Sequence, residues 1–298
     1  MNINFKSVMK YYFTTIIALI TCMNSNAQDF ELAGIRYLNY PTTKANNADS
    51  SKFSIQEFGG FFNIPSILNK DSTSIIINGL GYGQVKIKSP ALNEGNINLH
   101  AINYRFSWIH KFNRQWTFIG VLEPTLASDF KSKLSSDDFV IQSMAMVTKR
   151  INTKFLIGGG LAYTTRFGYP LVMPVVPIKY KSKKHRINAL LPIKIIYAYQ
   201  VNPKVDIGLK AVVNGANFNI TGYSNDLTEI NKVNYTRGNI GPVIYYKPKK
   251  IFTIEISGGI STNRTFRLVD IEDNTYYNTA STEAFFNIGL VIKPSGSK

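Results

Sequence analysis

The segment Ile102-Asn103-Tyr104-Arg105-Phe106-Ser107-Trp108 decides the fold, because apolar and polar residues alternate along it without a break. In an extended chain, Ile, Tyr, Phe and Trp fall on one face, and Asn, Arg and Ser fall on the other. Successive side chains of a strand point to opposite faces of a sheet, so this period of two predicts a β-strand with one apolar and one polar face.

The same alternation recurs through most of the chain after Gln28, and no amphipathic helical pattern interrupts it. It is found in residues 116–124, 139–147, 155–163, 187–199, 205–213, 251–261 and 283–292. The runs last about 9 to 13 residues, which is the length of a tilted strand that crosses a bilayer. The fold class is therefore predicted to be all-β.

The connections between the runs alternate in length. Short turns at 111–114, 149–154, 201–204 and 247–250 are separated by longer polar connections at 128–138, 168–184, 219–231 and 269–279. Trp, Tyr and Phe gather beside the short turns, as in the aromatic girdle of an outer-membrane barrel. We expect one antiparallel transmembrane β-barrel from about Asp29 to Lys293.

About twelve strands are expected, with Ile254, Ile256, Phe286 and Ile288 facing lipid. The region 168–184 is interpreted as a loop, because Pro170, Pro174 and Pro177 cannot donate to a β-ladder. An extra hairpin made from 172–180 and 187–191 would raise the number to fourteen.

Composition narrows the class of protein. The 298 residues carry 34 Lys and Arg against 18 Asp and Glu, and the mean hydropathy of −0.07 excludes a polytopic helical membrane protein. The single cysteine, Cys22, excludes a disulfide framework. A positive balance also suggests nucleic acid, but the Lys and Arg residues are divided between turns and strand interiors, so no nucleic-acid partner is expected.

Residues 1–27 are interpreted as a secretory signal peptide. Lys6 and Lys10 precede an apolar segment at 11–20, and Ser25-Asn26-Ala27 forms a cleavage site. A membrane anchor is the first alternative, although the apolar segment is short for a span. Lipoprotein processing at Cys22 is the second, although Thr21 fits it poorly. Residues 28–298 then form one barrel domain in the outer membrane.

The mature chain resembles bacterial outer-membrane β-barrels, in particular a Bacteroidota barrel family defined as a domain of unknown function. The likeness rests on Asn26-Ala27-Gln28, on the Lys- and Asn-containing short turns, and on the last strand, Asn287-Ile288-Gly289-Leu290-Val291-Ile292. That strand is similar to a barrel-assembly signal, although the chain ends at Lys298 without a terminal aromatic residue. The resemblance implies the barrel-assembly machinery, outer-membrane lipid and lipopolysaccharide as partners, and it transfers no functional residue.

The polar faces of the strands carry the candidate site. In a barrel this face lines the lumen, and basic residues on it outnumber acidic ones. The expected lumen-lining residues are Arg105, Glu123, Arg166, Arg186, Lys194, Asp206, Lys210, Arg237, Glu255 and Glu283. Two interpretations stay open: ion pairs that brace a closed, structural barrel, or a passive pore whose cationic lining favours small anionic solutes.

Catalysis and cofactor binding are not expected. The chain has three histidines, His100, His110 and His185. His110 is interpreted as an interfacial side chain beside a short turn, and His185 lies in a Lys/Arg run with no acidic partner nearby in sequence. Gly158-Gly159-Gly160 lies within a strand with no helix after it, unlike a phosphate loop. Asp137-Asp138 and Asp270, Glu272 and Asp273 are interpreted as solvated loop charge rather than a Ca²⁺ site. An adhesin-like surface barrel and, less favoured, a lipid hydrolase remain as alternatives.

Overall fold

The protein is described here by a computed structural model that covers residues 30–44, 52–88, 96–225 and 228–294. The predicted signal peptide and Cys22 lie outside these residues. The strands are β1 (Ala33–Lys44), β2 (Lys52–Ile67), β3 (Ser74–Lys88), β4 (Asn96–Lys111), β5 (Trp116–Ser128), β6 (Phe139–Arg150), β7 (Phe155–Thr164), β8 (Leu171–Lys181), β9 (His185–Leu191), β10 (Lys194–Asn202), β11 (Val205–Asn225), β12 (Thr228–Tyr246), β13 (Phe252–Asp270), β14 (Thr275–Ala280) and β15 (Glu283–Ile292). One 3-10 helix, η1 (Ser136–Asp138), precedes β6.

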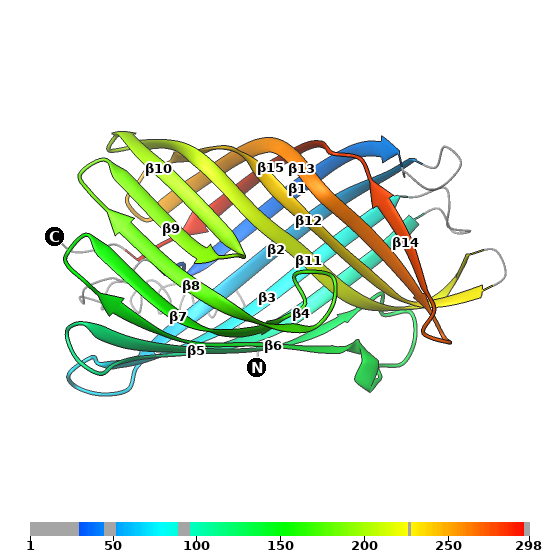
Figure 1. Ribbon diagram of the computed structural model, residues 1–298, viewed down its shortest axis with the longest axis horizontal. Helices are drawn as coiled ribbons and strands as arrows, with labels where there is room; N and C mark the ends of the chain where they lie inside the picture. Colours follow the sequence, from blue (N-terminus) through cyan, green and yellow to red (C-terminus); the bar gives the residue numbers. More distant parts are fainter. Residues whose placement is uncertain (1–29, 45–51, 89–95, 226–227, 295–298) are drawn as a thin grey trace, which may run out of the picture.

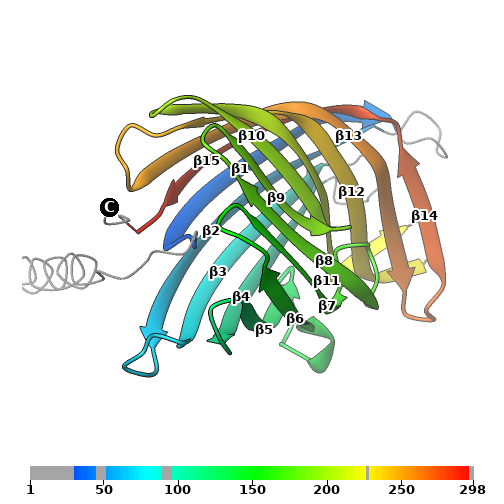
Figure 2. The ribbon, with the colours of Figure 1, turned by 60° about the vertical axis from the view of Figure 1, so that its left-hand side comes forward.

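The strands form a closed barrel (Figures 1 and 2). Each strand from β1 to β13 pairs antiparallel with the next, and β15 pairs with both β13 and β1 to close the wall. Of the fifteen strands, β14 pairs with β13 beyond the ring, so the wall has fourteen. The alternative of fourteen strands is confirmed.

The predicted loop at 168–184 is wrong, because β8 runs through it. The β7–β8 pairing passes from Ile157↔Ile178 to Gly160↔Val175, so Val176 and Pro177 pair with β9 instead. The missing proline donor is therefore accommodated where the β7–β8 ladder is interrupted. The predicted loop at 219–231 is also mostly strand, since β11 extends to Asn225 and β12 starts at Thr228. In 269–279, β13 ends at Asp270 and β14 starts at Thr275.

The wall extends less far along the barrel axis on one side than on the other. The β9–β10 hairpin ends halfway along the barrel, whereas β11, β12 and β13 continue past it (Figure 1). Beyond that level β5 pairs directly with β11, in parallel, through Ser128 and Asn219. The five strands β6 to β10 are thus left out, and nine of the fourteen strands enclose the end that carries the longer connections.

The two faces of the wall exchange polarity along the strands, as β4 shows. Near the short turns its outward side chains are apolar, such as Ile102, Tyr104 and Trp108, each more than 40% exposed. Toward the other end the outward residues are polar, and the inward residues Ile97 and Leu99 are fully buried. β11 repeats the inversion, with Ile207 and Leu209 facing outward near its start and Phe218 and Ile220 buried inward near its end.

The polarity exchange divides the barrel into two parts. We call the short-turn part, apolar outside and polar inside, the membrane half. We call the other part the cap: the loop-side ends of β1–β5, β11–β13 and β15 around an apolar cluster that includes Tyr40, Leu99, Phe218, Val233 and Phe285. The cap is polar outside and apolar inside, like a small soluble barrel, and an interior of about eight strands is narrow enough for side chains to fill.

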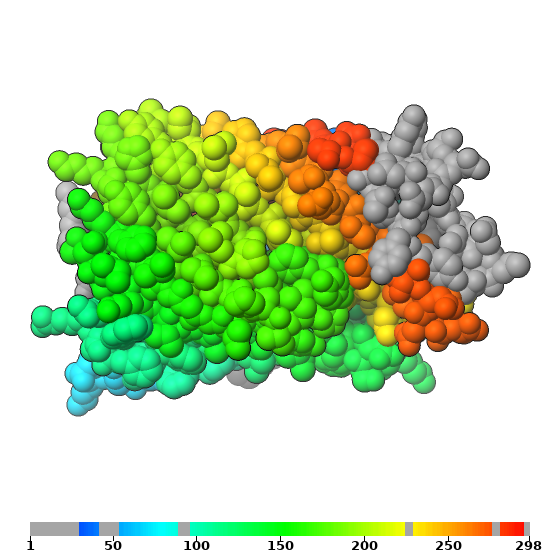
Figure 3. Space-filling model, viewed as in Figure 1, coloured from blue at the N-terminus to red at the C-terminus, as the bar shows by residue number. Residues whose placement is uncertain are grey.

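The outer surface of the membrane half has the predicted character. Ile256, Phe286 and Ile288 are exposed, and Trp108 and Trp116 are exposed beside a short turn. Ile254, on the same side of β13, is half-buried. Figure 3 shows side chains of β7 to β13 covering the near side of this wall. Among the described residues, no helix is long and apolar enough to cross a membrane.

Candidate functional site

The candidate site is the lumen of the membrane half, where charged side chains meet in layers. The layer nearest the short turns is built on Asp206 at the start of β11, whose carboxylate is fully buried. Asp206 pairs with Arg186 of β9, and its Oδ2 lies 2.6 Å from Nζ of Lys247, in the β12–β13 turn. This group ties three separate segments together at the lumen entrance.

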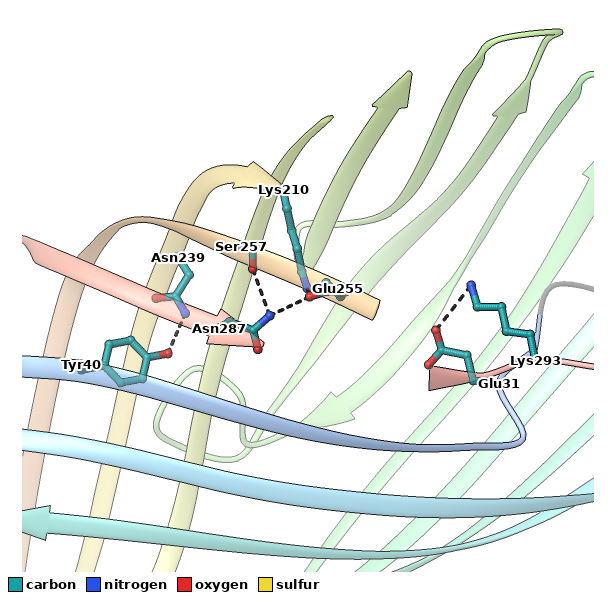
Figure 4. A network of polar contacts seen from close by, with 8 residues as sticks. All are labelled: Glu31, Tyr40, Lys210, Asn239, Glu255, Ser257, Asn287 and Lys293. Carbon is teal, nitrogen blue, oxygen red and sulfur yellow. Dashed lines mark hydrogen bonds and ion pairs between the residues drawn. The ribbon is translucent and has the colours of Figure 1, made fainter. Parts of the chain in front are cut away.

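A second layer joins β11, β13 and β15 (Figure 4). Lys210 Nζ lies 2.6 Å from Glu255 Oε1, and Asn287 Nδ2 donates to the same oxygen at 2.9 Å. Asn287 also donates to Ser257 Oγ at 3.0 Å. On the strands β4 and β5, Arg105 and Glu123 form a further ion pair of 2.5 Å. The basic residues of these pairs are neutralised by the wall itself.

Further cations project into the lumen or toward it without an ion pair to any described residue. Among them are Arg36 on β1, Lys194 on β10, and Arg166, which follows β7. Arg36 lies between Ile35 and Tyr37, which face outward, so its own side chain faces inward. Arg166 differs from the prediction that placed it on a strand. It occupies the turn between β7 and β8, where its carbonyl accepts a hydrogen bond of 3.1 Å from Thr236 Oγ1 of β12.

The lumen of the membrane half is accessible to water. Although they point inward, the side chains of Arg105 and Arg186 are 40% and 39% exposed, and Arg36 is exposed as well. A charge in contact with water keeps its hydration, so these cations attract anionic solutes at little desolvation cost. The excess of basic over acidic groups therefore gives the space a cationic character.

A polar layer separates this wet lumen from the cap. Arg237 of β12 reaches across to Glu57 of β2, and its guanidinium carbon lies 4.3 Å from the Tyr40 ring centroid and 4.7 Å from that of Tyr235. Asn239 Nδ2 donates to the Tyr40 hydroxyl at 2.7 Å (Figure 4). Arg237 is 2% exposed, so it lies at the inner limit of the lumen rather than along its open wall.

The cap above this layer is dry and filled. Tyr40, Ile97, Leu99, Ile230 and Val233 have no exposed surface. A cavity of about 10 Å³ lies beside Arg237, Arg264 and Phe266, which is about the space needed for one water molecule. Glu283, predicted to line the lumen, lies at the loop end of β15 and accepts a hydrogen bond of 3.4 Å from Ser281.

The histidines lie apart from the lumen, each on the outer face beside a hydroxyl group. His100 Nδ1 is 2.8 Å from the Tyr82 hydroxyl, His110 Nδ1 is 2.6 Å from Ser74 Oγ, and His185 Nδ1 is 2.9 Å from the Tyr197 hydroxyl. The arrangement suits residues at a membrane interface.

Two of the acidic loop residues, Asp138 and Asp270, are not solvated as predicted. Asp138 and Asp270 are buried and accept hydrogen bonds from their own connections. In the part of the chain that the structure describes, no group of three or more His, Cys, Asp or Glu side chains is placed to hold a metal ion.

Sequence reasoning missed Arg36, Glu57, Tyr40 and Asn239. Arg36 had a usable signal, because Gly34-Ile35-Arg36-Tyr37-Leu38 places a lone cation between two outward apolar residues. Glu57, Tyr40 and Asn239 act through contacts between strands that are distant in sequence, which one sequence does not reveal.

Comparison with known proteins identifies the family of the chain. Residues 30–293 match the family described as Domain of unknown function (DUF6268), and the chain belongs to that family. No curated protein sequence matches the chain.

Three solved structures illustrate the structural likeness. The translocator domain of the autotransporter NalP from Neisseria meningitidis is 10% identical, with 97% of this chain and 98% of that chain covered and a TM-score of 0.41. An outer-membrane channel from Pseudomonas putida F1 is 12% identical, with 90% and 99% covered and a TM-score of 0.43. The toluene transporter TodX from Pseudomonas putida is 10% identical, with 93% of each chain covered and a TM-score of 0.37. These scores are too low to transfer a function. The closed barrel and its outward apolar surface identify an outer-membrane β-barrel protein.

Proposed function

We propose that this protein is an outer-membrane barrel that admits small anionic solutes into a cationic lumen from the short-turn side and whose cap closes the path in the conformation described. The observation that carries the proposal is a set of inward cations without an ion pair to any described residue. These are Arg36, Arg166 and Lys194, and they lie beside the water-exposed Arg105 and Arg186. A barrel braced only for stability would gain nothing from cations that its own carboxylates do not neutralise.

The filled cap argues against a permanently open pore. Its core is apolar and fully buried, and a dry apolar constriction excludes ions from a path. Passage therefore requires the cap to open, and the closed form is expected to be electrically silent.

Planar-bilayer recordings test both parts. Wild-type protein is expected to give little conductance, and the double variant Leu99→Ala/Phe218→Ala, which removes buried side chains from the cap, is expected to give steps that favour anions. Ile260→Ala deletes an outward apolar side chain of β13 and serves as the control. Because large-to-small core changes each cost about 2–5 kcal/mol, retained strand content is checked by circular dichroism.

A second variant tests the cations directly. Adding Arg36→Gln and Lys194→Gln to the cap variant is expected to shift its selectivity toward cations. If a folded cap variant gives no conductance at any voltage, the barrel is structural and the proposal fails. Cation preference in the cap variant would also contradict it.

A further inference from the structure

We infer that the inner end of the lumen holds a binding site for the oxyanion of a small solute, carboxylate or phosphate, between Arg36 and Arg237. The inference deepens the proposed function, because it locates where an anionic solute would stop beneath the cap. It rests on three features: an inward cation without an ion pair, a wall beside it that lacks side chains, and a buried arginine with unused donors.

The side chain of Arg36 points into the open part of the lumen. Its cross-strand neighbours are Gly289 on β15 and Gly59 on β2, so the two positions directly beside it carry no side chain. Its inward side chain is exposed, and it forms no ion pair with any described residue. A guanidinium placed this way keeps its planar pair of donors available for a carboxylate or a phosphate.

The wall next to Arg36 is a hollow lined by glycine. Gly59 pairs with Gly83, which pairs with Ala101, so the inward faces of β2, β3 and β4 carry almost no side-chain atoms at this level. A Cβ atom on Gly59 would meet only the Tyr82 carbonyl oxygen at 3.6 Å, and one on Gly83 only Ala101 Cβ at 3.9 Å. Space for a solute therefore lies directly beside the Arg36 strand position.

Arg237 forms the roof of the hollow. It is paired with Glu57, which lies two residues before Gly59 on the same face of β2, and its guanidinium lies over the Tyr40 ring. Arg237 is 2% exposed, yet its Nε and Nη1 atoms have no hydrogen-bond partner among the described residues. Buried donors without an acceptor cost free energy, and an oxyanion at the roof would supply the acceptor.

The strand spacing limits the size of the solute. Arg36 and Tyr40 are four residues apart on β1, which is about 13 Å at about 3.3 Å per residue. A space of that length suits a compact solute of a few non-hydrogen atoms rather than an oligosaccharide or a lipid.

Isothermal titration calorimetry on the full-length protein in detergent micelles tests the site, with sodium acetate and sodium phosphate as probes and sodium chloride as the ionic-strength reference. Saturable binding of acetate or of phosphate is expected. Acetate binding identifies a carboxylate site, and binding of phosphate alone identifies a phosphate site. Arg36→Gln is expected to weaken the affinity by about 10- to 100-fold, because it removes a charge-assisted hydrogen-bonding pair. Gly83→Leu, which fills the hollow, is expected to abolish binding.

Two outward substitutions provide matched controls. Gly159→Leu places the same side chain on the outer face of β7, where a Cβ atom would meet nothing within 4 Å, and Lys86→Gln removes an exposed charge from β3. Both are expected to bind like wild type. Absence of saturable binding, or unchanged binding by Arg36→Gln, overturns the site.

The outcome separates the site from the proposed function. An anion-selective cap variant without saturable binding would leave the proposed function standing and remove this site. Saturable binding together with an electrically silent cap variant would do the reverse.

Discussion

Glu255 shows at the scale of one residue how the lumen keeps charges inside a narrow barrel. Its carboxylate is nearly buried and is held by Lys210 Nζ at 2.6 Å and Asn287 Nδ2 at 2.9 Å. A buried charge is tolerated only when its partners stay in place, since removing one partner leaves the other uncompensated. The loss of either partner is therefore costly, even where the net contribution of the pair to stability is small.

Lys210→Met is expected to lower the free energy of unfolding by about 3–5 kcal/mol, because Glu255 would remain charged and without its cation. Urea unfolding in micelles measures the change. The double variant Lys210→Met/Glu255→Gln is expected to recover most of the loss, since no buried charge is left. Equal losses in the single and double variants would show that the loss does not come from an unpaired charge on Glu255.

The connection between β5 and β6 is the element that fastens the cap where β6 to β10 are absent. Asp129 Oδ2 accepts a hydrogen bond of 3.1 Å from the Thr221 amide of β11, and Asn219 Nδ2 donates to Asp138 Oδ1 at 2.9 Å. The Ser135 amide donates to Asp138 Oδ2 at 2.7 Å. The bonds from Thr221 and Asn219 attach the segment 129–138 to a strand six positions away around the wall, and the Ser135 bond holds Asp138 in place within the segment.

The Asp138 bonds make this attachment sensitive to acid. Burial alone would raise the pKa of Asp138, but hydrogen bonds from Ser135 and Asn219 hold it below its ordinary value. A lowered folded-state pKa stabilises the protein above the unfolded pKa of about 3.9, and that stabilisation is lost as the pH falls through the folded value. The protection of residues 129–138 from hydrogen exchange, measured relative to an unfolded chain at the same pH, is therefore expected to stay high down to about pH 4 and to fall below it.

The same exchange measurement at neutral pH checks the assignment. Asp138→Asn is expected to accelerate exchange in 129–138, whereas Asp137→Asn, which changes the exposed neighbour, is expected to leave it unchanged. Similar exchange in both variants would exclude Asp138 as the attachment point.

Elements differ in how well the sequence alone predicts them, and the reason is physical. Residues 102–108 and 252–260 follow the rule for a membrane strand, apolar outward and polar inward, and their assignments hold in β4 and β13. Residues 219–223 belong to the cap, where the apolar residues Ile220 and Tyr223 face inward, so Asn and Thr face outward and resemble a loop. β8 was predicted only as an alternative to a loop, because two prolines lie within it. The cross-lumen contacts of Arg237 depend on strand curvature, which periodicity does not specify.

The orientation of the whole molecule follows from its two ends. If the short turns face the periplasm, as expected for an outer-membrane barrel, the cap lies at the cell surface and the cationic lumen opens inward. Protease added to intact cells is then expected to cleave the connection at 129–138 and to spare the turn at 112–115. Cleavage at 112–115 with 129–138 protected would reverse the orientation.

The exchange of polarity along the strands also determines how far the bilayer extends over the whole molecule. Ile256 lies within the outward apolar surface of β13, and Asn98 lies outward on β4 beyond the last apolar outward residue, Ile102. An arginine at the bilayer midplane costs about 2–4 kcal/mol, and the cost falls to about 0–1 near the interface. Ile256→Arg is therefore expected to lower stability by about 2–4 kcal/mol, whereas Asn98→Arg is expected to change it by less than about 1. Denaturant unfolding in bilayers of fixed thickness measures both. A similar loss in the two variants would mean that lipid also surrounds the cap, and a cap inside the bilayer would need an apolar outer surface that β3 and β4 do not have, since Lys86, Lys88, Asn96 and Asn98 are exposed there.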